Sequence, residues 1–436
     1  MGDQRGKGRG GGLGSLARAL AVASVLASAG RAQEGARGEL ERALSEPCAP
    51  AELRRRLFGL DASELPRLFA FAVEGHLPGA GPDDDALRAE SRRELVREVL
   101  AARPRRELVP FLEDLAGRPA ETGVRLEALR LLGAIGCGDH LKLLARLAVA
   151  PQERGALAPE LREAFTSALG AILVRDPAAL SQMAALFSES SPCLASSIVE
   201  ALAGLRAPQA TRVLAGLLGR VPGLDPLLLV RLAERGRMHA AGDESVFDAV
   251  RRYLKQRDPA LVCAAARACG RLGDDGAVEA LVGLMDHSDA RVKASAFQAL
   301  ADITGLGFGT DAARWTSWYH AEMRWWDGEA ESLLAGIERG RGLEFVRAAR
   351  EVLEHRLYRD RIAESFTQAL TRKNAEEVRL ACRALEQLRS TQAIAGLVEC
   401  LERDDPAVRE AAWHALRAIT GVELPPERDS WAQLAG

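Results

Sequence analysis

The sequence predicts an all-α protein, built as an α-solenoid of stacked antiparallel helical hairpins. Residues 274–315 and 390–431 align without a gap at a constant offset of 116 positions, so one structural unit occurs at least twice in the 436-residue chain. Aromatic residues make up only 5% of the composition, and no run of β-branched residues alternates with polar ones. Strands therefore have no support, and the repeated helical unit sets the fold class.

Each copy of the unit contains two amphipathic segments. The second segment of the first copy places apolar residues at i, i+4, i+7, i+8 and i+11, which is one stripe along a helix, at Val292, Ala296, Ala299, Leu300 and Ile303. The segment before it carries a shorter stripe of Val278, Leu281, Val282 and Met285. A hairpin of two such helices cannot bury both apolar faces alone, so neighbouring hairpins must stack on it.

Helix boundaries are marked at the same places in both copies. Asp289 and Asp405 precede the second helix, where an aspartate side chain accepts free backbone N–H groups of the first turn. Pro406 suits the first helical position, which needs no N–H. Gly305 and Gly421 end the second helix, because glycine adopts the left-handed cap conformation without steric cost.

The run D-P-x-V-R-x-A-A-x-x-A-L at residues 405–416, followed by Ile-Thr-Gly and a tryptophan ten residues later, resembles the HEAT-repeat family. It is most similar to the short variety called PBS-lyase HEAT-like repeats, and the tryptophan extension resembles secreted bacterial HEAT proteins. Degenerate relatives of the run begin at Gly123, Leu161, Leu194, Leu261 and Val378. The resemblance covers about residues 84–431 and implies a solenoid scaffold, whereas it says little about function because solenoids serve many roles.

The N-terminus predicts export. Basic residues from Arg5 to Arg18 precede an apolar run at 19–29, and Gly30 and Ala32 are the small residues expected before a cut at Gln33. The mature protein is then expected to be secreted or periplasmic. The alternative is a glycine-rich tail on a cytosolic protein. No later uncharged run approaches the length that spans a bilayer.

The rest of the chain divides at composition breaks. We expect a signal peptide at 1–32, an N-terminal helical segment at 33–82, a HEAT-like array at 83–326 that ends in a tryptophan-rich helix, and C-terminal HEAT-like repeats at 327–436. The breaks fall at 75–86, 219–226, 236–243 and 327–342. The acidic run 83–85 is interpreted as a solvated helix start, because a calcium loop needs alternating ligands.

No pattern in the chain indicates a cofactor, a metal or a catalytic group. The seven cysteines lack ligand spacing, and their odd number leaves at least one unpaired, with a single disulfide left open. The seven histidines are scattered, with no metalloprotease, nucleophile-elbow or P-loop motif. A net charge of −3 with interleaved acidic and basic residues argues against nucleic acid. We therefore expect no enzyme.

One stretch, residues 314–326, is rich in aromatic residues. Its aromatic side chains fall at i, i+3, i+4, i+10 and i+11 of a helix, in one stripe formed by Trp315, Trp318, Tyr319, Trp325 and Trp326. A stacking platform for a carbohydrate or another flat ligand is one interpretation. An aromatic wedge that joins two parts of the array is the other, and it is favoured because Trp431 recurs at the position equivalent to Trp315.

These observations predict a non-catalytic scaffold that binds another protein through a concave helical surface. The outward positions of the second helices would line that surface, at Ser295, Gln298 and Asp302 in one copy and at Ala411, His414 and Ala418 in the other. The alternatives are a carbohydrate-binding module that uses the aromatic stripe, and a lyase-like accessory protein suggested only by the family name.

Overall fold

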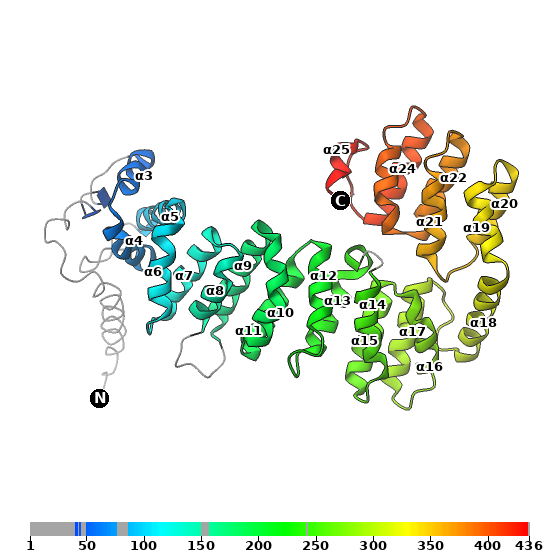
Figure 1. Cartoon of the computed structure of the whole chain (residues 1–436), viewed down its shortest axis with the longest axis horizontal. Helices are drawn as coiled ribbons and strands as arrows, with labels where there is room; N and C mark the ends of the chain where they lie inside the picture. The colour runs from blue at the N-terminus through cyan, green and yellow to red at the C-terminus, as the bar shows by residue number, and fades with distance from the viewer. Residues whose placement is uncertain are drawn as a thin grey trace, which may run out of the picture. The chain divides into compact units, whose positions relative to one another are not determined.

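A computed structural model describes residues 40–41, 43–44, 49–75, 86–149, 157–240 and 243–434. Every regular element in these ranges is an α-helix or a short 3₁₀-helix, as Figure 1 shows. The all-α prediction is confirmed. The chain forms two compact units, residues 1–205 and 206–436, each with its own packing.

Unit 1 contains nine described α-helices: α3 (Pro50–Phe58), α4 (Leu65–Glu74), α5 (Ala86–Ala102), α6 (Arg105–Ala116), α7 (Thr122–Ile135), α8 (Leu141–Ala148), α9 (Pro159–Arg175), α10 (Met183–Glu189) and α11 (Pro192–Gly204). From α6 onward they alternate as the first and second helices of successive hairpins. The second helices α7, α9 and α11 pack in a row, and the first helices α6 and α8 contact each other beside it.

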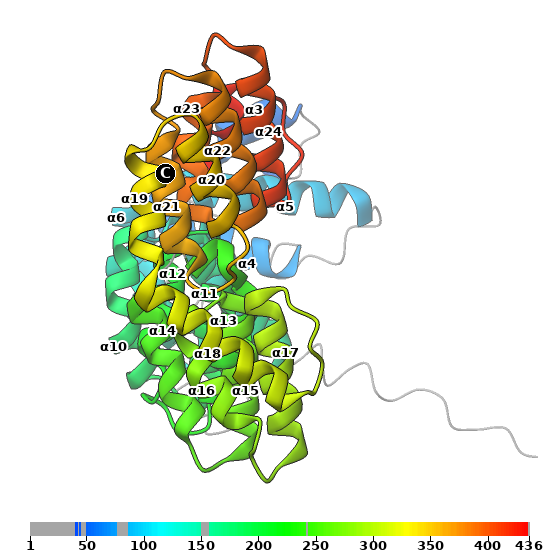
Figure 2. The ribbon, with the colours of Figure 1, turned by 90° about the vertical axis from the view of Figure 1, so that its right-hand side faces the viewer.

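Unit 2 continues the pattern with α12 (Pro208–Leu217), α13 (Asp225–Ala240), α14 (Glu244–Arg251), α15 (Pro259–Leu272), α16 (Val278–Leu284), α17 (Ala290–Thr304), α18 (Ala312–Gly328), α19 (Ala330–Arg339), α20 (Leu343–Val352), α21 (Arg359–Ala369), α22 (Ala375–Leu388), α23 (Ile394–Cys400), α24 (Pro406–Thr420) and α25 (Arg428–Trp431). Two rows of second helices result, α13–α15–α17 and α20–α22–α24, and α18 contacts α16 on one side and α19 on the other (Figure 2).

Small residues let the second helices approach closely within a row. A Cβ atom added to Gly270 of α15 would lie 2.8 Å from the Cα atom of Ala299 in α17. A Cβ atom on Gly133 of α7 would lie at the same distance, 2.8 Å, from Ala168 of α9. Glycine at these positions therefore permits backbone contact that any larger residue would push apart.

The two aligned copies fold alike, as the sequence predicts. The carboxylate of Asp289 accepts the N–H of Arg291 at 2.8 Å, and that of Asp405 accepts the N–H of Ala407 at 2.8 Å. Gly305 and Gly421 end their helices in the left-handed conformation, at φ 73° and 70°. The predicted caps are confirmed at both ends of both helices.

Some predictions change in the structure. The break expected at 327–342 is largely helix α19, because Leu333, Leu334 and Ile337 form an apolar stripe that outweighs the surrounding glycines. At Gly236, with φ 64°, the backbone kinks inside α13, whose span continues to Ala240. The predicted signal peptide at 1–32 and the acidic run 83–85 lie outside the described residues. Each helix that the structure describes is too short or too polar to cross a membrane.

Candidate protein-binding surface

The outward face of α17 is polar and accessible. Gln298 and Asp302 are exposed and Ser295 is half-buried, whereas the opposite stripe of the same helix is buried. The side-chain amide of Gln298 donates to the Asp302 carboxylate at 2.8 Å, one helical turn away. This i, i+4 pair orders two side chains on a surface that no other described helix covers at these positions.

The equivalent face of α24 differs in chemistry. His414 has 48% of its side chain exposed and lies 3.9 Å from the Glu410 carboxylate one turn earlier. Its imidazole ring lies 5.2 Å from the Trp413 ring, and the Arg417 guanidinium lies 4.6 Å from the same indole ring. Ala411 and Ala418 at the remaining outward positions are half-buried. The outward residues of α17 and α24 belong to different rows and are not brought together.

The N-terminal half of the tryptophan-rich helix α18 is packed into the preceding hairpin. Trp315 is fully buried, its indole N–H donates to the Gly309 carbonyl at 3.0 Å, and its ring meets Phe308 edge-on at 4.8 Å. Trp431 repeats this geometry, fully buried with its N–H bonded to the Pro425 carbonyl at 2.7 Å. In both copies the acceptor is a backbone carbonyl, so the hydrogen bond is kept although Pro425 stands where the first copy has Gly309.

The C-terminal half of α18 packs against the segment between α20 and α21. The imidazole of His355 stacks on buried Trp325 at a ring distance of 3.5 Å and an angle of 12°. Half-buried Trp326 contacts the Tyr358 ring at 4.6 Å and the Arg361 guanidinium at 5.2 Å. A carbohydrate-binding platform needs adjacent exposed indole faces. The indole rings of Trp325 and Trp326 instead pack against other residues of the protein.

The Glu322 carboxylate also joins α18 to the segment between α20 and α21. Its nearly buried carboxylate accepts the backbone N–H groups of Arg356 at 3.3 Å and Leu357 at 3.4 Å. The His355 Nδ1 atom lies 3.3 Å from the other carboxylate oxygen, at an ion-pair distance without hydrogen-bond geometry. Local sequence patterns did not indicate this contact, because Glu322 and His355 meet only through tertiary packing.

A second buried contact ties α21 to the first half of unit 2. The Asp275 carboxylate accepts the N–H of Arg359 at 3.0 Å, and the Arg359 side chain donates to the Thr304 carbonyl at the end of α17. The Oδ1 atom of Asp275 is shut off from solvent and has no hydrogen-bond partner. Burial raises the pKa of Asp275 to about 7, against the neighbouring arginines, and burial lowers the pKa of Arg359 to about 10.

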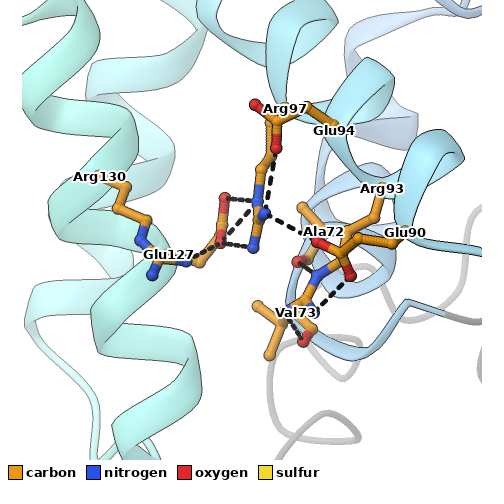
Figure 3. Close-up of polar contacts among 8 residues, drawn as sticks. All are labelled: Ala72, Val73, Glu90, Arg93, Glu94, Arg97, Glu127 and Arg130. Atoms are coloured by element: carbon orange, nitrogen blue, oxygen red, sulfur yellow. Dashed lines mark hydrogen bonds and ion pairs between the residues drawn. The ribbon is translucent and has the colours of Figure 1, made fainter. Parts of the chain in front are cut away.

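Unit 1 holds its own polar network, drawn in Figure 3. The Arg97 guanidinium of α5 grips the buried Glu127 carboxylate of α7 in a two-point bond, with nitrogen–oxygen distances of 3.0 and 2.9 Å. Arg93 donates to the Ala72 and Val73 carbonyls near the end of α4, both at 2.7 Å. Burial alone would lower the pKa of Arg97, but the bonds and charge of Glu127 raise it. The network joins α5 to α4 through Arg93 and to α7 through Arg97.

No group of three or more metal-ligating side chains comes together within the described ranges. The six described cysteines are free thiols, four of them buried, at Cys137, Cys193, Cys263, Cys269, Cys382 and Cys400.

Residues 232–301 and 363–427 match the family of HEAT repeats. These segments contain α14–α16 and α22–α24 in full, together with most of α17 and α21 and part of α13. The two segments therefore carry HEAT repeats, and the predicted α-solenoid of stacked helical hairpins is confirmed. A comparison with curated protein sequences finds no match.

Several solved structures are similar in fold. An engineered protein is 18% identical over 88% of this chain and 99% of its own, with a TM-score of 0.28. Human deoxyhypusine hydroxylase in complex with glycerol is 20% identical over 68% of this chain and 100% of its own, with a TM-score of 0.26. The karyopherin Kap121p bound to the extreme C-terminus of the phosphatase Cdc14p is 11% identical over 92% of this chain, with a TM-score of 0.38. The chain spans about half the length of that karyopherin, 50%. None of these similarities bears on activity or partners.

Proposed function

We propose that this HEAT-repeat protein is a non-catalytic scaffold that binds another protein through the outward faces of its second helices. The carrying observation is the contrast between the two aligned copies. The buried positions of their second helices are identical, as at Val292 and Val408, whereas the outward positions differ, as at Gln298 and His414. Packing fixes the first set, and the second set is free to match a partner.

The outward residues of α17 suit polar recognition. Gln298 and Asp302 offer a donor and an acceptor that already hold each other in position, so less side-chain entropy is lost when a partner binds. On α24, the exposed His414 beside Trp413 supplies an aromatic and titratable contact. No comparable set of accessible side chains among the described residues supports a carbohydrate platform or a lyase-like accessory role.

Affinity capture tests this proposal. The tagged full chain is expected to retain a discrete protein partner from the cells that produce it, and Gln298→Arg with Asp302→Arg should release that partner because both polar contacts are replaced by long cations. Lys373→Glu is the control, since Lys373 is exposed on the turn before α22, away from the outward face of α17. Equal capture by the double variant and the wild type would contradict the proposal.

We propose in addition that the scaffold acts outside the cytosol, as a secreted or periplasmic protein. The support is the order of basic, apolar and small residues up to Ala32. N-terminal sequencing of the native protein should begin near Gln33. A terminus at Met1 in a cytosolic fraction would contradict export and leave the binding proposal untouched.

A further inference from the structure

A groove lies between the first helices α19 and α21, on a different set of helices from the second-helix surface proposed above. It has a volume of about 830 Å³, and residues 326–328 of α18 also line it. We propose that this groove docks an extended segment of another protein that carries two or more arginine or lysine side chains.

Both walls present a regular helical stripe to the groove. On α19 the lining residues include the positions i, i+3, i+4 and i+7, at Glu331, Leu334, Ala335 and Glu338, with Ala330, Ser332 and Arg339 beside them. On α21 they follow the same spacing, at Arg361, Glu364, Ser365 and Gln368. Positions spaced in this way lie on one face of a helix, so the groove is a feature of two facing helices and not of a single loop.

The charges of the walls favour a cationic guest. Four carboxylates line the groove against two guanidinium groups, a formal balance of −2. Asp327, Glu331 and Glu364 are exposed, and none of them forms an ion pair with any residue of the described ranges. By contrast, the Arg361 guanidinium lies over the Trp326 ring, and Glu338 accepts the Ser365 hydroxyl at 2.9 Å. Arg339 also lines the groove without an ion pair in the described ranges, so three unpaired carboxylates face one unpaired guanidinium and the balance of the unused charges is negative.

The shape favours an extended segment. A stripe from i to i+7 spans about 10.5 Å of helix axis, which equals roughly three residues of extended chain. The α19 side of the groove contains Ala330 and Ala335, whose small side chains leave room for a peptide backbone, and Leu334 gives the peptide an apolar contact. An acidic segment would meet uncompensated carboxylates on both walls, so charge selects a basic one.

Fluorescence anisotropy with defined peptides tests the proposal on the full chain. The probe is a labelled peptide of about twelve residues that alternates arginine and serine, compared with a glutamine–serine peptide of the same length. The arginine peptide should bind saturably and the glutamine peptide should not. Glu331→Gln and Glu364→Gln should each weaken binding about threefold, and the double variant about tenfold, as expected for exposed charge pairs.

Two further variants separate a built groove from general attraction to an acidic protein. Glu351→Gln with Glu354→Gln, here called the α20 pair, removes two exposed carboxylates outside the groove, one from the last turn of α20 and one from the turn that follows it, and should leave binding unchanged. Ala335→Phe narrows the groove from the α19 side without a change of charge and should abolish binding, with an unaltered circular dichroism spectrum as the check on folding. The proposal is overturned if the arginine peptide does not bind, if the α20 pair weakens binding as much as the groove pair, or if Ala335→Phe binds normally. None of these results concerns the second-helix surface at Gln298, so the groove proposal can fail while the proposed function stands.

Discussion

Replacement of Trp315 by alanine should destabilise unit 2 by about 4 kcal/mol. The indole is fully buried, and burial of an aromatic side chain removes roughly 150 to 250 Å² from water, worth about 4 to 6 kcal/mol at about 25 cal/mol per Å². The variant also loses the hydrogen bond to the Gly309 carbonyl and the edge-on contacts with Phe308 and Trp318. Partial relaxation around the cavity brings the expected cost into the range of about 3 to 5 kcal/mol observed for such substitutions.

Chemical denaturation followed by circular dichroism measures this cost, and hydrogen exchange locates it. Because each repeat contacts only its neighbours, the loss of Trp315 should loosen the chain beyond α18 first. We expect faster exchange at residues 333–352, which include most of α19 and all of α20. The exchange of unit 1 should not change, since its helices pack in a separate compact unit.

Trp315→Phe and Trp431→Ala serve as controls. Phenylalanine keeps a buried six-membered ring but loses the N–H bond and part of the ring volume, so its cost should be smaller than that of alanine, about 1 to 3 kcal/mol. Trp431 has the same burial and bonding at the last hairpin, so its loss should affect exchange only near α23 and α24. An unfolding free energy for Trp315→Ala within about 1 kcal/mol of wild type, with native exchange at 333–352, would refute the packing argument.

Three other substitutions test separate parts of the structure. Asp405→Ala removes the acceptor for the Ala407 N–H and should destabilise the last hairpin by about 1 kcal/mol in a denaturation curve. Gly270→Val should cost about 1 to 3 kcal/mol through overpacking, because a Cβ atom there lies 2.8 Å from Ala299. Burial raises the pKa of Asp275 to about 7, so the folded protein resists an ionisation that the unfolded chain undergoes near pH 4. The free energy of unfolding of the wild type should therefore fall as pH rises from about 4 to 7 and then level off, and Asp275→Asn should remove most of that fall.

Each of these predictions has a clear contrary result. An unchanged denaturation midpoint for Asp405→Ala would place the helix boundary elsewhere. A Gly270→Val protein with wild-type stability would mean that α15 and α17 are not in backbone contact. Identical slopes for Asp275→Asn and wild type between about pH 4 and 7 would show that Asp275 is ionised in the folded protein at low pH.

The repeat itself could be predicted from the sequence because its signals are local. Asp405 and Gly421 act within one helical turn of their own positions, and the apolar stripe from Val292 to Ile303 follows from helical periodicity alone. The recurrence of a tryptophan at residue 431 argued for packing, and the buried indoles of Trp315 and Trp431 support that interpretation.

The contacts between repeats could not be predicted in this way. Glu322 and His355 are far apart in sequence and meet only because α18 packs against the α20–α21 connection. Arg97 and Glu127 pair across two hairpins, and neither spacing nor composition identifies them as partners. The close approach of Gly336 in α19 to Ala348 in α20 has no local signal either. The groove between α19 and α21 depends on the same packing and could not be predicted from the sequence.

Site-specific photo-crosslinking in the producing cells tests the central claim most directly. A benzoylphenylalanine residue placed at Gln298 or His414 lies on an exposed second-helix face, and one placed at Lys373 lies on an exposed turn. If the second helices bind a protein partner, irradiation should give a discrete adduct with another protein from position 298 or 414 and none from position 373. Absence of an adduct at both helical positions, or the same adducts from position 373, would contradict the account.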